Sequence, residues 1–299
     1  MTQQKKWTGK TGGGNFGQKF LFLVLKSIKV SLLYPILFFV VPFYCLFRAK
    51  DFRSIYRYFR EIHHYSKWKS FRKTIRNHMV FGRVVLDKFA VLAGNSGQFS
   101  INVDNVSQFE TLLSQPEGFI LMAAHIGNFE IIGHCLRQNQ KQVHCLIYGG
   151  EGATLQNKRD ESLRKNNIHL IPIQEDMSHI FEIKKALDNG GIIIILCDRV
   201  WGSNKQIPLN FMGKQASLPL GPFIMAAQLE VQAIFVAVMK EKSLHYSGYL
   251  TQLNLPENPL NIREKSKYLA NEYSKAMDKI LRQYPEQWFN YYDFWHVNN

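Results

Sequence analysis

The chain has 299 residues, 46% of them hydrophobic, and this composition excludes an intrinsically disordered chain and permits a sizeable core. No repeat recurs at a fixed period, which excludes solenoids and propellers. The formal net charge of +14 predicts an anionic partner, for which nucleic acid, an anionic membrane surface and an acidic protein are the candidates. The four cysteines are scattered singly, which is neither a zinc pattern nor a disulfide framework and fits a reducing compartment.

An uncharged apolar run of eighteen residues occupies positions 30–47 and reads VSLLYPILFFVVPFYCLF. A helix that crosses the hydrocarbon core needs about 20 apolar residues, and it tolerates prolines such as Pro35 and Pro42. The run is too long for a signal peptide, and no cleavage motif follows it. We therefore predict a polar segment at 1–19 and a retained membrane anchor at 20–48, with a buried core helix as the alternative. Basic residues flank the run on both sides, which fits a steeply tilted or re-entrant helix as well as a spanning one.

Residues 49–110 interleave Arg and Lys with Phe, Tyr and Trp. This pattern is typical of helices that lie on an anionic membrane, although nucleic-acid binding uses the same residue types. The adjacent apolar anchor favours lipid, so we predict an anionic membrane as partner and no nucleic acid. A solvated basic helix face with the aromatic residues in the core is the alternative.

From residue 118 onward, short apolar runs alternate with segments of helical spacing. This alternation predicts an α/β fold with a mostly parallel central sheet flanked by helices, and a catalytic domain over 111–299. Active sites in such folds lie beyond the carboxyl ends of strands, which selects the segments after Ala124 and Cys197. The expected strands are 118–125, 142–148, 168–173, 192–197, 231–239 and 245–253. The expected helices are 127–140, 153–165, 178–189, 217–229 and 261–282.

The first selected segment places His125 at a strand end and Glu130 five positions later. Residues five apart on one helix point about 140° apart, so the two side chains can meet only if His125 lies on the turn before the helix. Gly127 permits such a turn, and Asn128 is suited to cap the helix or to contact an oxyanion. We predict that His125 takes a proton from an attacking hydroxyl while Glu130 orients its ring. The amides near Gly127 and Asn128 are expected to stabilise the oxyanion, and a purely structural histidine is the alternative.

The segment AHIGNFE resembles the H-x-G-N-W-E motif of the lipid A biosynthesis acyltransferases of the lauroyl/myristoyl type, with Phe129 in place of Trp. Further blocks resemble that family in the same order along the chain. They are Cys-Asp-Arg at 197–199, the run from Pro208 to Pro222, and Tyr-Pro-Glu-Gln-Trp-Phe at 284–289. Together with the N-terminal anchor, the resemblance covers roughly residues 20–295.

The resemblance implies a bacterial inner-membrane enzyme with a glycerolipid-acyltransferase-like fold and its catalytic domain on the cytoplasmic side. It implies acyl carrier protein as the acyl donor, an acidic partner that part of the positive charge attracts, and a hydroxyl of a lipid A precursor as the acceptor. By analogy with the family, Asp198 and Arg199 lie at the mouth of the same crevice and bind the acceptor or the thioester region. A structural salt bridge between these two residues is the alternative.

Other functions stay open at this stage. The opening residues 7–14, WTGKTGGG, resemble a divergent branch found with aryl-polyene or related lipid pathways. The same chemistry on another acceptor, such as an aryl-polyene pigment or an amino-acid lipid, is therefore the second hypothesis. A non-catalytic basic membrane protein is a third possibility, against which the intact pair of His125 and Glu130 speaks. No histidine has metal-ligand spacing and no phosphate loop or G-x-S-x-G elbow is present, so we predict no metal, no cofactor and no acyl-serine intermediate. Direct attack on a thioester follows, with acyl-CoA as the alternative donor.

Overall fold

The computed structural model describes residues 23–132, 136, 141–148, 168–174, 176–200, 205–255 and 260–295. The predicted helix 153–165, the segment 1–19 and part of the predicted helix 127–140 lie outside these residues. The longer helices are α2 (Leu37–Phe47), α3 (Ala49–Arg57), α4 (Lys67–Leu92), α5 (Val106–Ser114), α8 (His179–Asp188), α9 (Leu220–Leu229) and α10 (Ile262–Gln283). The short helical segments are η1 (Val30–Ile36), η2 (Tyr58–Ile62), η3 (Ser96–Gln98), η4 (Phe129–Ile131) and η5 (Pro285–Gln287).

Seven of the described strands form one mixed sheet in the order β1-β9-β8-β2-β5-β3-β4. These strands are β1 (Ser100–Val103), β2 (Phe119–Ala123), β3 (Val143–Tyr148), β4 (Ile168–Ile173), β5 (Ile192–Leu196), β8 (Ala233–Lys242) and β9 (His245–Leu253). All neighbouring pairs are parallel except β8 and β9, so β8, β2, β5, β3 and β4 end at the same edge of the sheet. The structure therefore confirms the predicted α/β fold with a mostly parallel sheet.

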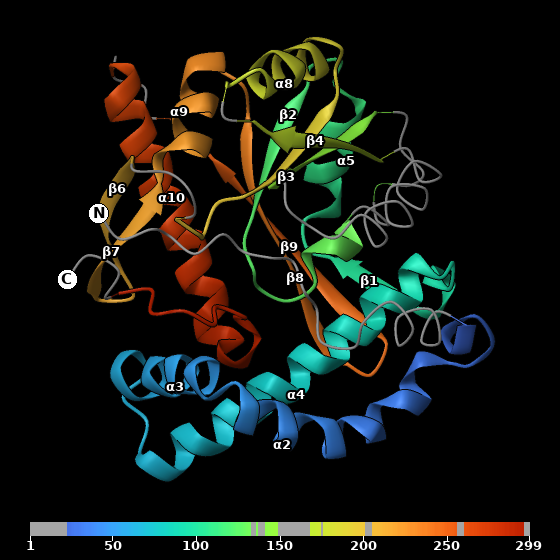
Figure 1. The fold of residues 1–299 in the computed structure, drawn as a ribbon. Helices are drawn as coiled ribbons and strands as arrows, with labels where there is room; N and C mark the ends of the chain where they lie inside the picture. Colours follow the sequence, from blue (N-terminus) through green and yellow to red (C-terminus); the bar gives the residue numbers. More distant parts are fainter. Residues whose placement is uncertain are drawn as a thin grey trace.

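Helices cover both faces of the sheet (Figure 1). Alternate residues of β2 enter two separate apolar cores, because successive side chains of a strand point to opposite faces. Residues of α8, α9 and α10 complete one core, and residues of α5 complete the other. The strands β2 and β5 are buried on both faces, which explains why their sequences are continuous apolar runs.

The N-terminal helices form a separate layer below the sheet in Figure 1, where α2 passes beneath α4. Residues 30–47 make one helical stretch that is long and apolar enough to cross a membrane, and 22% of it is buried. The buried side includes Val41 and Leu37, which packs against Gly82 of α4. Large side chains such as Phe39 (74% exposed) and Phe47 (84% exposed) have no protein cover among the described residues. The predicted membrane anchor is thus an apolar helix that packs on α4 along one side only.

Three strands, β1, β6 and β7, differ from the sequence predictions. A hairpin of β6 (Gln206–Phe211) and β7 (Lys214–Pro219) packs apart from the main sheet, and β7 takes the first residues of the predicted helix 217–229. Pro219 accounts for the boundary, because proline begins a helix readily and its extended backbone precedes the first turn of α9. The short edge strand β1 carries little apolar sequence and is also additional to the prediction.

Candidate active site

The two strand ends selected from the sequence lie next to each other in the sheet. Ala123 of β2 is paired in register with Leu196 of β5. His125 and Asp198 each lie two residues beyond this pair, which brings their side chains together. The ring Nδ1 of His125 lies 2.7 Å from Asp198 Oδ1, and the backbone amide of His125 donates to Asp198 Oδ2 at 3.0 Å.

The Asp198 side chain is completely buried, whereas 22% of the His125 side chain is exposed. Trp288 donates its indole N–H to Asp198 Oδ2 (3.3 Å), and the hydroxyl of Tyr292 donates to the Asp198 carbonyl oxygen (3.1 Å). Burial alone would raise the pKa of the Asp198 carboxyl, but the charge and hydrogen bonds of His125 and the nearby Arg199 lower this pKa to about 2. Asp198 is therefore an ionised acceptor at neutral pH.

This pairing fixes the chemistry of the His125 ring. An ionised carboxylate can only accept hydrogen bonds, so we assign the ring proton to Nδ1. Nε2 then carries the free lone pair, and none of the hydrogen bonds formed by the described residues involves it. A neutral imidazole with this orientation can take a proton from a hydroxyl, and the buried carboxylate stabilises the imidazolium that forms.

The turn after His125 requires glycine at position 127. Gly127 has a φ of +53°, and a Cβ at this position would collide with the carbonyl oxygen of Val238. The amide of Gly127 donates to Gln287 O (2.8 Å), and the amide of Asn128 donates to Val238 O (2.7 Å). Both N–H groups are thus bonded within the protein, and the predicted use of these amides for an oxyanion does not fit this conformation.

Asn128 has a different role from the two that the sequence suggested. Its side chain makes no capping bond to η4. The side-chain amide instead donates to the hydroxyl of Tyr246 at 3.3 Å, and only 2% of Asn128 is exposed. Asn128 therefore connects the His125 turn to the neighbouring strand β9.

Glu130 forms an ion pair with Lys88 of α4 and makes no hydrogen bond with His125. The predicted contact between His125 and Glu130 is therefore replaced by the contact between His125 and Asp198. Phe129 lies edge-on to the His125 ring, with ring centroids 5.9 Å apart, and occupies the space beside it. Lys88 supplies a charge partner that attracts the Glu130 carboxylate away from the ring.

Residues near the C-terminus complete the site. Phe289 donates its amide to His125 O (2.9 Å), and Arg199 Nη2 donates to Phe289 O (3.1 Å). Arg199 is therefore fixed to the C-terminal segment, and its Nε is buried without a partner among the described residues. From the sequence, no role at the site was assigned to Trp288, and the only signal for one was its place in the Tyr-Pro-Glu-Gln-Trp-Phe block. Within the described residues, no group of three His, Cys, Asp or Glu side chains is placed to hold a metal ion.

A groove of about 1100 Å³ lies between α4 and the segment formed by the end of β8 and η5. Its basic lining side chains outnumber the acidic ones by seven to two, which makes the groove suited to an anionic group. The basic residues are Lys69, Arg72, Lys73, Arg76, Arg83, Lys240 and Lys242, and the acidic residues are Glu241 and Glu286. Phe38 of α2, Trp68 and Phe71 also line it, which connects the groove to the exposed apolar surface of the N-terminal layer.

Comparisons with protein families and with solved structures each found proteins that are similar to this chain. A family model described as bacterial lipid A biosynthesis acyltransferase matches residues 48–296. Among solved structures, the chain is similar to the 1-acyl-sn-glycerophosphate (LPA) acyltransferase PlsC from Thermotoga maritima. The TM-score is 0.41 at 15% identity, over 88% of this chain and 97% of that chain. No curated protein matches the sequence. The region matched by the family model contains both His125 and Asp198.

Proposed function

The chain belongs to the family of bacterial lipid A biosynthesis acyltransferases, and from this premise we propose that it moves a fatty acyl chain from acyl carrier protein to a hydroxyl of a lipid A precursor. Family membership confirms the resemblance that the sequence motifs indicated. The observation that carries the proposed chemistry is the hydrogen bond between His125 and the buried Asp198 at the ends of two adjacent parallel strands.

In the proposed reaction, Nε2 of His125 takes the proton of the acceptor hydroxyl as its oxygen attacks the thioester carbonyl carbon. The new C–O bond forms, the tetrahedral intermediate collapses and the C–S bond breaks. The thiolate of the donor leaves and takes the proton back from His125. Asp198 holds the imidazole and stabilises its positive charge throughout, and it does not itself take the proton. The products are an ester and the free thiol of the donor.

Glu130 remains a candidate catalytic residue in this proposal, because it occupies the acidic position of the family motif. Its ion pair with Lys88 supports a role at the rim of the site. Asp198 is the better candidate for the group that orients His125, since it contacts the ring directly.

The proposed location is the bacterial inner membrane, with the catalytic domain on the cytoplasmic side. The apolar helical stretch 30–47 supports a membrane anchor, and the basic groove beside it supports contact with an anionic lipid. Acyl carrier protein is acidic, so the net charge of +14 favours its association with this enzyme. Acyl-CoA is the alternative donor, and an aryl-polyene pigment or an amino-acid lipid is the alternative acceptor.

The test is a discharge assay with the full chain in detergent. Lauroyl-, myristoyl- and palmitoyl-carrier proteins are incubated with the enzyme in the presence and absence of lipid A precursor, and thioester loss and ester formation are measured by mass spectrometry. His125→Ala removes the base and is expected to lower ester formation by about 10³-fold or more. His245→Ala is the matched control, because His245 is an exposed histidine on β9 outside the site. It is expected to leave the rate unchanged.

The outcomes separate the alternatives. Ester formation on lipid A precursor that depends on His125 supports the full proposal. Activity only with another acceptor keeps the chemistry and rejects lipid A precursor as the acceptor. Activity only with acyl-CoA keeps the chemistry and rejects acyl carrier protein as the donor. If His125→Ala equals the wild-type chain on every substrate, catalysis by this site is wrong and a non-catalytic membrane role becomes the better explanation.

A further inference from the structure

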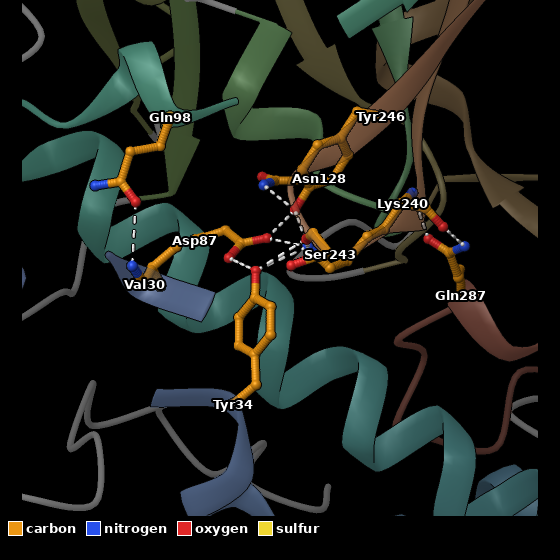
Figure 2. A network of polar contacts seen from close by, with 9 residues as sticks. All are labelled: Val30, Tyr34, Asp87, Gln98, Asn128, Lys240, Ser243, Tyr246 and Gln287. Atoms are coloured by element: carbon orange, nitrogen blue, oxygen red, sulfur yellow. Dashed lines mark hydrogen bonds and ion pairs between the residues drawn. The ribbon is translucent and has the colours of Figure 1, made fainter. Parts of the chain in front are cut away.

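Figure 2 shows a buried polar network that extends from Tyr34 to Asn128. Tyr34 belongs to the apolar segment 30–47, here called the membrane segment, and Asn128 belongs to the turn that follows His125. At the centre of the network, Lys240 of β8 and Asp87 of α4 form an ion pair in which the side chains are 4% and 0% exposed. The hydroxyl of Tyr34, which lies in η1 within the apolar segment, donates to Asp87 at 2.6 Å. Lys240 also donates to the Tyr34 hydroxyl at 3.1 Å. Tyr34 of the membrane segment is therefore part of a buried charge cluster formed with α4 and β8.

Two hydrogen-bonded routes lead from this cluster to the His125 turn. On the first route, the Tyr246 hydroxyl donates to Asp87 and accepts from the side chain of Asn128 at 3.3 Å. On the second route, the backbone N–H and C=O of Lys240 are bonded to the side-chain amide of Gln287, at 2.9 and 2.8 Å. The carbonyl of Gln287 then accepts from the amide of Gly127. Two residues of the turn, Gly127 and Asn128, are thus hydrogen-bonded to Gln287 and Tyr246, and both of these residues are bonded to the cluster.

The network is expected to be rigid because a buried charge that loses its partner costs free energy. Burial raises the pKa of Asp87 and lowers that of Lys240, so each residue depends on the other and on the surrounding hydroxyls to stay charged. Removing one bond in a buried network of this kind leaves a polar group unsatisfied. Alternative positions of the turn that would separate Tyr246 or Gln287 from the cluster are therefore disfavoured.

We propose that three positioning residues, Tyr34, Asp87 and Lys240, hold the His125 turn in place. Through them, the geometry of the turn depends on how the membrane segment packs against α4 and β8. The membrane segment is then a structural part of the active site as well as a tether. The inference builds on the proposed acyl transfer, but the connection itself is measurable in the enzyme without substrate.

The first test uses Tyr34→Phe in the full chain in detergent, because this change removes one hydroxyl and keeps the ring. Tyr44→Phe is the matched control, since Tyr44 belongs to the same apolar segment and its hydroxyl contacts Asp51 outside the network. Hydrogen–deuterium exchange is measured for the peptides that cover residues 124–132 and 284–290. We expect faster exchange in both peptides for Tyr34→Phe and wild-type exchange for Tyr44→Phe, with equal retention of both variants on vesicles.

The second test measures kcat and KM separately, with the carrier-protein thioester as the donor. If the turn is held less firmly, the His125 base is misplaced, but contacts with the donor elsewhere are unaltered. Tyr34→Phe is therefore expected to lower kcat by roughly tenfold and to leave KM unchanged. Asp87→Asn together with Lys240→Met removes both charges at once, which avoids an unpaired buried ion. This double variant is expected to fold, to bind vesicles and to show the same loss of kcat.

Two results would overturn the inference. The first is wild-type exchange at residues 124–132 in both Tyr34→Phe and the double variant. The second is a loss of kcat in Tyr44→Phe as large as that in Tyr34→Phe, which would indicate a general effect of the membrane segment. If the wild-type chain transfers no acyl group at all, the proposed function fails, and the exchange data still decide whether the connection exists.

Discussion

At the scale of single residues, the partner of His125 decides how the site works. Asp198 contacts Nδ1 and is buried, whereas Glu130 is bonded to Lys88. Asp198→Asn keeps the size of the side chain and removes the charge, so the imidazolium loses its stabilisation and the ring tautomer is no longer fixed. We expect kcat to fall by about 10³- to 10⁴-fold in this variant.

Glu130→Gln is the contrasting variant, and we expect a loss of less than about tenfold, because Glu130 does not contact His125 and its partly exposed ion pair with Lys88 contributes little. Both kcat values are measured with the same donor and acceptor, and circular dichroism establishes that both variants fold. Equal and large losses in the two variants would show that Glu130 acts directly in the reaction, as the family motif first suggested.

The same two residues show what the sequence could and could not predict about the site. The sequence identified His125 and the segment after Cys197 because both follow apolar strands. It paired His125 with Glu130 because these two are close in the chain. The true neighbour depends on β2 and β5 being adjacent and in register, although they are about seventy residues apart in the sequence. Strand order in a parallel sheet is not encoded in any local pattern, so this contact required the three-dimensional structure.

At the scale of elements, helix α4 has two functions on two faces. One face is buried and supplies Asp87 to the polar network, and the other lines the basic groove. Arg72 and Arg83 have no ion-pair partner among the described residues, whereas Lys73 and Arg76 are bonded to Glu286. Neither guanidinium group is neutralised by a carboxylate of the described residues, so both contribute net positive charge to the groove, and that of Arg83 also lies 5.5 Å from the centre of the Tyr34 ring.

Replacing Arg72 and Arg83 together by Gln is expected to weaken binding to vesicles that contain phosphatidylglycerol. Each basic residue near an anionic bilayer contributes about 1 kcal/mol, so the double change corresponds to a loss on the order of 30-fold. Binding is measured by vesicle sedimentation at physiological salt. The matched control replaces Arg263 and Lys267, which are exposed on α10, by Gln. If the control weakens binding as much, the overall charge and not the groove is responsible.

The elements themselves were predicted with uneven success, for physical reasons. The strands β2, β5 and β8 were evident because they are buried on both faces and read as apolar runs. The capped helix α10 was evident from its amphipathic spacing and begins with a capping box at Asn261. The hairpin of β6 and β7 was not predicted. Residues of β6 alternate as in a half-buried strand, but the run is short and Pro208 within it argues against a strand. Such a hairpin gains its stability from packing against neighbours that the sequence does not reveal.

At the scale of the whole molecule, the seven-stranded sheet and the N-terminal helical layer share one buried polar network. Tyr34 in the apolar segment, Asp87 in α4 and Lys240 at the end of β8 come from three distant parts of the chain. The C-terminal segment contacts both regions, through Trp288 to Asp198 and through Gln287 to Lys240. Segments that are far apart in the chain therefore meet in one continuous assembly around the His125 turn.

Acid should loosen this assembly through Asp198. Its pKa is lowered from 3.8 to about 2 in the folded protein, so the unfolded chain binds the proton more readily between these values. The ionised carboxylate therefore stabilises the fold fully above about pH 5, and this contribution, about 2 kcal/mol, is lost as the pH falls through 4 towards 2. We expect the thermal midpoint of the wild-type chain in detergent to fall more steeply over this range than that of Asp198→Asn, which has no carboxyl to protonate. The two midpoints should differ most near neutral pH and converge in acid. Parallel curves from pH 6 to pH 2.5 would show that Asp198 contributes no pH-dependent stability and that its charge matters only for catalysis.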